Sequence, residues 1–187
     1  MANFWSVAST EPKRSFRWVF SLGQGTDNQI ESYFVKSVKK PSFTINEIEH
    51  QFVAHRFYYP SRVTWNTCEL TFVDPVQPDT SAILANIFVD AGYRSPITQD
   101  IAEFSLSKGK FADKIGQPII TALDAEGEDI EAWTLWNAWI TALDFGQLDY
   151  NTDELVVISM TLRYDYATLQ NFNTTPTSKL TPTPVAG

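Results

Sequence analysis

The chain of 187 residues has a single cysteine, Cys68, and no long uninterrupted apolar run. One cysteine cannot form an internal disulfide, which agrees with synthesis in a reducing cytosol. Cys68 lies on the apolar side of an alternating segment, so we expect a small buried side chain rather than a nucleophile. No stretch approaches the ~20 apolar residues of a membrane-spanning helix. The first residues also lack an apolar signal core, so we expect no membrane anchor and no secretion by that route.

Basic residues are scarce. Lysine and arginine together number 14 against 22 acidic residues, which gives a formal net charge of −8. A protein that grips nucleic acid needs a basic patch, so this composition argues against one, although it allows a protein past which nucleic acid slides without sticking. The 43% hydrophobic and 14% aromatic content indicates a folded chain. Its length predicts one domain that buries roughly 70% of the surface exposed when unfolded.

Residue patterns typical of metal, calcium or dinucleotide sites are also missing. His50 and His55 are five residues apart on an expected extended segment, hence on opposite faces, and no third ligand accompanies them. The acidic run 124–131 lacks the spacing of a calcium-binding loop and indicates a solvated hairpin tip. Gly23-Gln24-Gly25 lacks the third glycine and the helix of a dinucleotide site. We therefore expect no catalytic residue, metal site or cofactor.

The apolar pattern predicts a mostly β fold. We expect a β-sandwich or partly open barrel with one inserted α-helix, in which Thr80-Ser81 begins the helix and Ala91-Gly92 ends it. Residues 93–118 are expected to be irregular, residues 1–13 to form an N-terminal arm, residues 14–167 the body, and residues 168–187 a Thr/Pro-rich tail with no core-forming pattern. The predicted strands cover residues 15–22, 30–39, 65–73, 119–123, 130–135 and 156–166.

Two predicted strands alternate with a period of two residues and so have one dry and one wet side. In the later strand Val156, Ile158, Met160, Leu162 and Tyr164 share the apolar side. The polar sides of the two strands hold Thr67, Glu69 and Thr71, and Ser159, Thr161, Arg163 and Asp165.

Residues 42–64 combine aromatic and basic side chains without a strong turn dipeptide before Tyr59-Pro60-Ser61. We interpret the segment as an extended hairpin or long loop that projects from the body. Side chains of these types are enriched at contact hot spots, and an exposed cluster of them marks a partner site; covering the core explains any single one of them equally well. The candidate contact residues are Phe52, Arg56, Phe57, Tyr58 and Tyr59.

Four short sequence motifs follow one another along the chain. A strand with Arg17, Trp18 and Phe20 is followed by 33–41, YFVKSVKKP, then by Trp65 with 70–74, LTFVD, and finally by 160–166, MTLRYDY. In this order and spacing the chain resembles the tail tube proteins of contractile-tailed bacteriophages over residues 14–167. The aromatic segment 42–64 and the residues after Tyr166 depart from the family pattern.

The resemblance implies a structural virion protein that is not an enzyme, made in the host bacterial cytoplasm and located in the phage tail. Six subunits would form a ring with one continuous β-barrel around a channel, and stacked rings would form the hollow inner tube that conducts DNA during contractile-tail ejection. The implied partners are further copies of the chain, the tail sheath, the baseplate, the tail terminator and a tape-measure protein in the lumen. DNA would pass without specific binding.

In such a tube one strand face lines the channel, so the seven polar residues above become candidates for the lumen and the aromatic segment a candidate contact between subunits or rings. Carboxylates in the lumen would repel phosphate, provided that Arg163 pairs with one of them. An ordinary solvent-facing sheet has the same period, and periodicity does not separate the two.

Other functions fit part of the pattern. The tube of a contractile injection system and a tube-initiating baseplate ring would share it. A carbohydrate-binding β-sandwich, from a different class, suits the acidity and the tryptophans Trp133, Trp136 and Trp139, although packing is the commoner role for such residues. A glycosidase would need a pair of carboxylates in an apolar setting, and none stands out.

Overall fold

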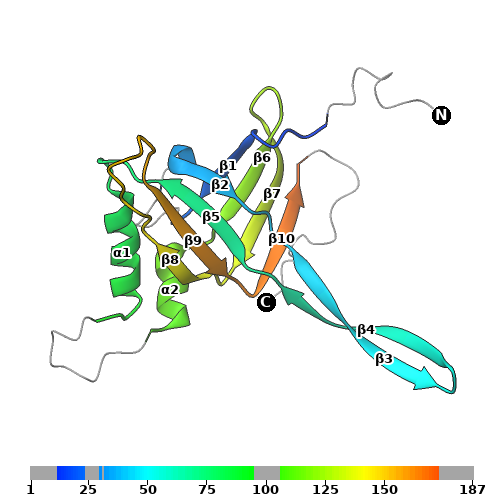
Figure 1. Cartoon of the computed structure of the whole chain (residues 1–187). Coiled ribbons are helices and arrows are strands. Elements are labelled where there is room, and N and C mark those ends of the chain that lie inside the picture. The colour runs from blue at the N-terminus through cyan, green and yellow to red at the C-terminus, as the bar shows by residue number, and fades with distance from the viewer. Residues whose placement is uncertain (1–11, 24–29, 31, 95–105, 173–187) are drawn as a thin grey trace, which may run out of the picture.

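The computed structural model describes residues 12–23, 30, 32–94 and 106–172 (Figure 1). The helical elements are η2 (Ser32–Phe34, a 3-10 turn), α1 (Thr80–Asp90) and α2 (Lys108–Ile115). The strands are β1 (Trp18–Ser21), β2 (Val35–Val38), β3 (Phe43–Phe52), β4 (His55–Trp65), β5 (Cys68–Val73), β6 (Ile119–Leu123), β7 (Asp129–Trp136), β8 (Trp139–Asp144), β9 (Val157–Arg163) and β10 (Tyr166–Asn171).

Two four-stranded antiparallel sheets form the body. One, which we call the β5 sheet, has the order β2-β5-β9-β8, and the other, the β7 sheet, has the order β1-β6-β7-β10. Phe72 and Met160 from the β5 sheet and Phe20 and Leu135 from the β7 sheet are almost fully buried in one shared core. The mostly β, sandwich-like fold that the sequence predicts is thus confirmed, and both sheets are open.

The prediction of a single helix is wrong, because α2 lies in the segment expected to be irregular. Phe111 and Ile115, one helical turn apart, are buried, and Gly116 follows the helix with φ 65°. α2 packs against α1 and β8. Two apolar positions give too short a repeat to predict a helix, so its place depends on the core that it covers.

Two predicted boundaries also need correction. Residues 30–39 do not form one strand, because η2 intervenes before β2. The tail predicted to start at residue 168 begins inside β10, whose Thr168 and Leu169 pair with Thr134 and Trp133 of β7. The sequence of β10 is mainly small and polar, so cross-strand pairing rather than a strong apolar pattern holds it in the sheet. Residues 1–11 of the predicted arm and 173–187 of the predicted tail lie outside the described residues.

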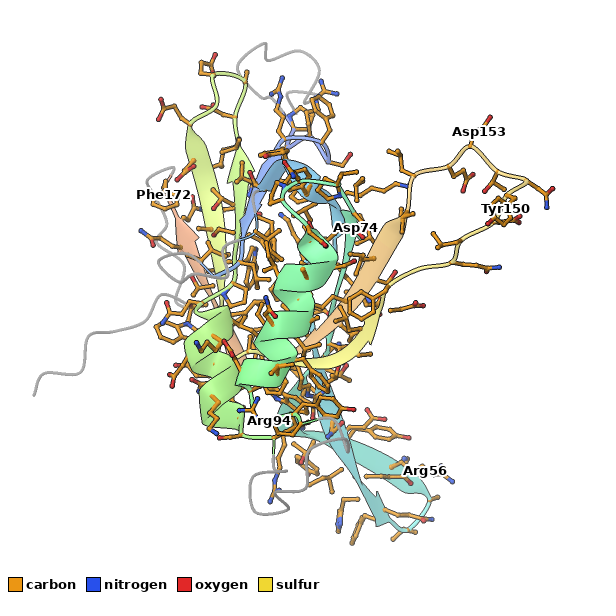
Figure 2. All side chains as sticks on the ribbon, turned by 90° about the vertical axis from the view of Figure 1, so that its left-hand side faces the viewer. Arg56, Asp74, Arg94, Tyr150, Asp153 and Phe172 are labelled. Atoms are coloured by element: carbon orange, nitrogen blue, oxygen red, sulfur yellow. The ribbon has the colours of Figure 1, made fainter. Side chains whose placement is uncertain are left out.

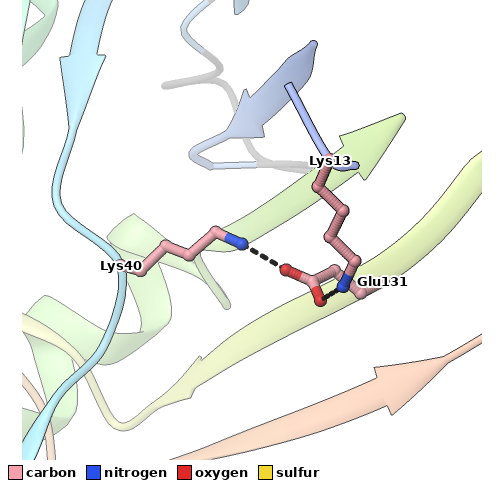
Figure 3. Close-up of polar contacts among 3 residues, drawn as sticks. All are labelled: Lys13, Lys40 and Glu131. Atoms are coloured by element: carbon pink, nitrogen blue, oxygen red, sulfur yellow. Dashed lines mark hydrogen bonds and ion pairs between the residues drawn. The ribbon is translucent and has the colours of Figure 1, made fainter. Parts of the chain in front are cut away.

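Glu131 ties the two sheets together. Its carboxylate, on β7, accepts hydrogen bonds from Lys13 before β1 and from Lys40 after β2 (Figure 3). Burial alone would raise the pKa of Glu131, but the two lysine hydrogen bonds outweigh burial and hold this pKa below its ordinary value. The two ion pairs of Glu131 therefore hold the segment before β1 and the segment after β2 against β7.

The segment predicted as a projecting hairpin or long loop is a hairpin. β3 and β4 pair with each other in a separate two-stranded sheet and extend away from the sandwich (Figure 1). At its base Trp65 packs edge-on against Phe43, with ring centroids 5.3 Å apart, and is 5.9 Å from the ring of Tyr164. Asn66 closes the base by donating its backbone N–H to the Ser42 carbonyl over 2.8 Å. The body thus holds only the root of the hairpin.

Candidate assembly surfaces

The outward face of the β5 sheet is a continuous band of small polar side chains. One row crosses all four strands through Ser37, Thr71, Ser159 and Asp144, and the Ser37 and Thr71 hydroxyl oxygens lie 2.6 Å apart. A second row places Glu69 beside Thr161. The opposite side chains of the same strands enter the core. Five sequence candidates therefore share this face: Glu69, Thr71, Ser159, Thr161 and Arg163.

Charge on the polar face is balanced rather than uniformly acidic. The Lys39 ammonium lies 3.5 Å from a Glu69 carboxylate oxygen, and the face also carries the positive Arg163 and the negative Asp144. The sequence already shows that Arg163 interrupts a uniformly acidic face, but it does not reveal that the end of β2 brings Lys39 beside Glu69. A neutral, hydroxyl-rich surface offers little adhesion to an ion of either sign.

Two of the seven lumen candidates lie at the margin of that face. Thr67 is in the link that precedes β5. Asp165 is in the turn after β9, where it accepts hydrogen bonds from Lys108 of α2 over 2.6 Å and from the Asn137 amide over 2.9 Å. The Lys108 hydrogen bond, helped by Asn137, lowers the pKa of Asp165. Asp165 thus anchors α2 to the end of the β5 sheet.

The edges of the β5 sheet are open. β2 and β8 are its outermost strands, and neither has a partner on its outer side within the described part of the chain. Because every neighbouring pair is antiparallel and the strands number four, β2 and β8 run in opposite directions. Unpaired edges are templates for pairing with another chain.

The outer part of the β3–β4 hairpin has two different faces. Its cross-strand pairs place Ile48 with Tyr59, His50 with Phe57 and Phe52 with His55 on one side, which we call the apolar hairpin face. The other side pairs Glu49 with Tyr58 and Gln51 with Arg56, and Arg56 lies 3.4 Å from Glu49. The five candidate contact residues therefore separate: Phe52, Phe57 and Tyr59 on the apolar hairpin face, Arg56 and Tyr58 opposite.

The two histidines share a face, contrary to the sequence-based expectation. The chain reverses at Val53-Ala54, which returns His55 to the side of the hairpin that carries His50. At this reversal Val53 has φ 54° and an 81% exposed side chain. A β-branched residue rarely adopts positive φ, and hairpin turns favour glycine or asparagine there. The tip thus presents an apolar side chain in a strained conformation.

A second projection joins β8 to β9. Figure 2 shows Tyr150 and Asp153 on this loop, well away from the body, while Arg56 marks the hairpin. Leu148, Tyr150 and Leu155 are strongly exposed. Since Val157 pairs with Val73 and Leu162 with Cys68, this loop and the hairpin leave opposite ends of the β5 sheet. Its apolar residues are scattered among polar ones, so the loop has no single apolar face.

Cys68 and the three tryptophans, considered above as a nucleophile and as a carbohydrate platform, occupy positions that suit packing instead. Burial raises the pKa of the Cys68 thiol to about 12, with a further contribution from Glu69. Trp133 and Trp136 lie on opposite faces of β7 and Trp139 lies in the other sheet, so the three tryptophans share no platform and no helix. Among the described residues no cluster of three or more potential metal ligands occurs, and none of the described helices has the length and apolarity needed to cross a membrane.

The architecture defines a class: an open antiparallel sandwich with a projecting hairpin. No protein-family model matches the sequence, and no curated protein sequence matches it either. Solved structures do. A chain of the tube-terminating cap of the anti-feeding prophage is similar with a TM-score of 0.63 and 18% identity, over 88% of this chain and 95% of that one. A chain of the six-fold symmetrised baseplate of the same particle gives a TM-score of 0.58 and 15% identity, over 88% and 99%.

Two further particles share the fold. A chain of the sheath–tube complex of PVC, an extracellular contractile injection system in its extended state, has a TM-score of 0.63 and 17% identity, over 91% of this chain and 99% of that one. The SPP1 tail tube has a TM-score of 0.50 and 11% identity, over 86% and 80%. The chain therefore has the fold of tail tube and tube-terminator components, as the sequence resemblance predicts.

Proposed function

We propose that the protein is a structural subunit whose copies join edge to edge into a ring, and whose rings stack into a hollow tube. The open β5 sheet carries this proposal. Rotation about a ring axis preserves strand direction, so β8 of one copy meets β2 of the next in antiparallel orientation and the sheet continues without interruption. Closing the sheet on itself removes every unpaired edge.

The ring contains six subunits in this proposal, as the tail tube resemblance implies and as the six-fold symmetry of the similar baseplate particle supports. The polar face of the β5 sheet then lines the channel, because the opposite face is already occupied by the core. Glu69, Thr71, Ser159, Thr161 and Arg163 become lumen residues, with Thr67 and Asp165 at the rim. No catalytic role is proposed for any of them.

Stacking would use the two projections. The β3–β4 hairpin and the loop between β8 and β9 leave opposite ends of the β5 sheet, so they reach opposite faces of a ring. Contacts that differ above and below a ring are heterologous and allow a filament to grow. The exposed side chains of the apolar hairpin face, among them Phe52, Phe57 and Tyr59, supply the contact area.

For the cargo and the particle, we propose two related versions. In a phage tail, located in the virion and made in the host cytoplasm, the tube conducts DNA past a neutral, hydroxyl-rich wall, with the tape-measure protein inside it and the sheath, baseplate and terminator around it. In a contractile injection system the same wall passes another cargo. Chains of the anti-feeding prophage and PVC particles and of the SPP1 tail tube all share the fold, which supports a tube in either version.

A cysteine-protection experiment tests which face lines the channel. Cys68 is buried with a raised pKa, so an introduced cysteine is the reactive thiol. We would compare Ser159→Cys on the polar face with Gln170→Cys on β10, using a small maleimide and a large polyethylene-glycol maleimide on separated monomers and on assembled tubes.

In tubes we expect the small reagent to label both variants and the large reagent to label only Gln170→Cys. Equal labelling of both variants by the large reagent in tubes would contradict a lumen lined by the β5 sheet. A chain that stays monomeric at high concentration and binds glycans would instead support the carbohydrate-binding alternative.

A further inference from the structure

A groove lies between α1 and β8, at the open edge of the β5 sheet. It has a volume of about 560 Å³ and is lined mainly by apolar side chains, including Phe88, Tyr93 and Phe145. Phe88 and Tyr93 stack with ring centroids 4.5 Å apart. An aromatic wall of this kind suits another aromatic side chain, which would pack against it edge-on or offset.

The opposite edge of the same sheet carries a matching feature. Tyr33, in η2 directly before β2, is 72% exposed although it is a large aromatic residue. Its ring rests on Phe34, with centroids 4.1 Å apart, so its orientation is supported from within the chain. An ordered aromatic side chain loses little conformational entropy when it enters a pocket, which is why such residues serve as anchors.

The strand directions bring the two features to the same end. β2 and β8 are antiparallel through the sheet, so the start of β2 and the end of β8, at Leu143 and Asp144, lie at the same end. The two features also lie on the same side. η2 contacts β1 of the β7 sheet, which puts η2, the element that carries Tyr33, on the core side of the β5 sheet. α1 and α2 cover that same side at β8.

From this placement we infer that the groove between α1 and β8 receives Tyr33 of the neighbouring copy in a ring. The inference rests on the proposed edge-to-edge ring and specifies its contact: the β2–β8 pairing supplies backbone hydrogen bonds, and Tyr33 in the groove fixes the register between copies. A register slip by one residue would move Tyr33 out of the groove, so the side chain discourages misaligned rings.

Cross-linking of a paired variant tests the contact. Tyr33→Cys is combined with Ala85→Cys, an exposed groove residue on α1, and the full chain is treated with a short bis-maleimide after mass photometry has established whether rings are present. Tyr33→Cys combined with Gln170→Cys on the far β10 is the matched control. We expect a ladder of covalent oligomers up to the closed ring for the first pair and no ladder for the control.

The outcomes separate the inference from the proposed ring. Rings without a ladder would overturn the Tyr33 contact and leave the ring standing. Absence of rings under all conditions would overturn both. As a second measurement, Tyr33→Ala should weaken ring association by ~30-fold, the size of a hot-spot truncation, whereas Tyr33→Phe should change it little. An unchanged association constant for Tyr33→Ala would also overturn the contact.

Discussion

The β5 sheet and the β3–β4 hairpin are both antiparallel and both carry large apolar side chains, yet these side chains end in opposite environments. Each strand of the β5 sheet buries one row of side chains in the shared core, whereas nearly every residue of β3 and β4 is exposed. A two-stranded hairpin is marginally stable in water on its own. The difference indicates that the core under the sheet is formed within the chain, whereas the hairpin gains almost no burial there, which agrees with the proposal that another copy contacts it.

The largest expected effect on the free energy of unfolding follows from truncating a buried side chain of the β5 sheet. Phe72→Ala should lower the free energy of unfolding by about 3–5 kcal/mol, because Phe72 is fully buried and its removal leaves a cavity. Phe57→Ala in the hairpin should change it by no more than about 0.5 kcal/mol. Urea unfolding of the monomer measures both, and equal losses would mean that the hairpin is part of the monomer core.

Assembly should respond in the opposite way to substitution in the hairpin. Phe57 and Tyr58 are 47% and 55% exposed but lie on different faces. We expect Phe57→Ser to raise the concentration needed for tube formation by ~30-fold, while Tyr58→Ser, the matched control, changes it by no more than ~3-fold. Light scattering against concentration gives both values. The same shift in both variants would remove the distinction between the two hairpin faces.

Glu131 joins the two sheets at the root of the hairpin, and its pKa makes a pH prediction. Because the folded-state pKa is lowered, the ionised carboxylate stabilises the fold above the unfolded-state pKa of about 4.3. That contribution is lost as the pH falls through the folded-state value. Glu131→Gln should cost about 1–3 kcal/mol at pH 7 and flatten the loss of stability below pH ~4.5.

Thermal or urea unfolding across this pH range measures the effect of Glu131→Gln. Asp129→Asn, at the exposed start of the same strand, is the control and should leave stability at pH 7 nearly unchanged. An unaltered acid slope in Glu131→Gln would show that other carboxylates dominate the acid response.

The smallest expected effect concerns the hairpin tip. Val53→Gly should relieve the positive φ and stabilise the hairpin by about 1 kcal/mol, because glycine adopts this conformation without a steric penalty. Slower amide exchange in β3 and β4 of the monomer would report it. If the apolar tip also makes a contact, the same variant should assemble less well. Faster exchange would show that Val53 stabilises the hairpin within the single chain.

The sequence predicts the parts of this fold that depend on local period. Alternation predicts the buried rows of β5 and β9, and the residues Thr80 and Asp90 bound the predicted helix α1 almost as expected, with Asp79 accepting the Ala82 backbone hydrogen bond as its N-cap. α2 and β10 were not predicted, because each depends on packing or pairing with distant elements more than on its own pattern.

On the candidate surfaces, too, some features follow from local sequence period and others depend on residues far apart in the chain. The polar sides of β5 and β9 follow from sequence period, and their joint face requires only that these two strands pair. The neutralising position of Lys39, the shared face of His50 and His55, and the open edges follow from register and chain reversal. A single sequence carries no direct signal for these, since they link residues far apart in the chain.

A cryo-electron microscopy reconstruction of the assembled full-length chain, at a resolution that separates strands, tests the central claim most directly. The account predicts six-subunit rings in which β2 of one copy pairs with β8 of the next, with Thr71, Ser159 and Thr161 facing the channel. A ring closed through other strands, or a channel lined by the β7 sheet, would contradict it.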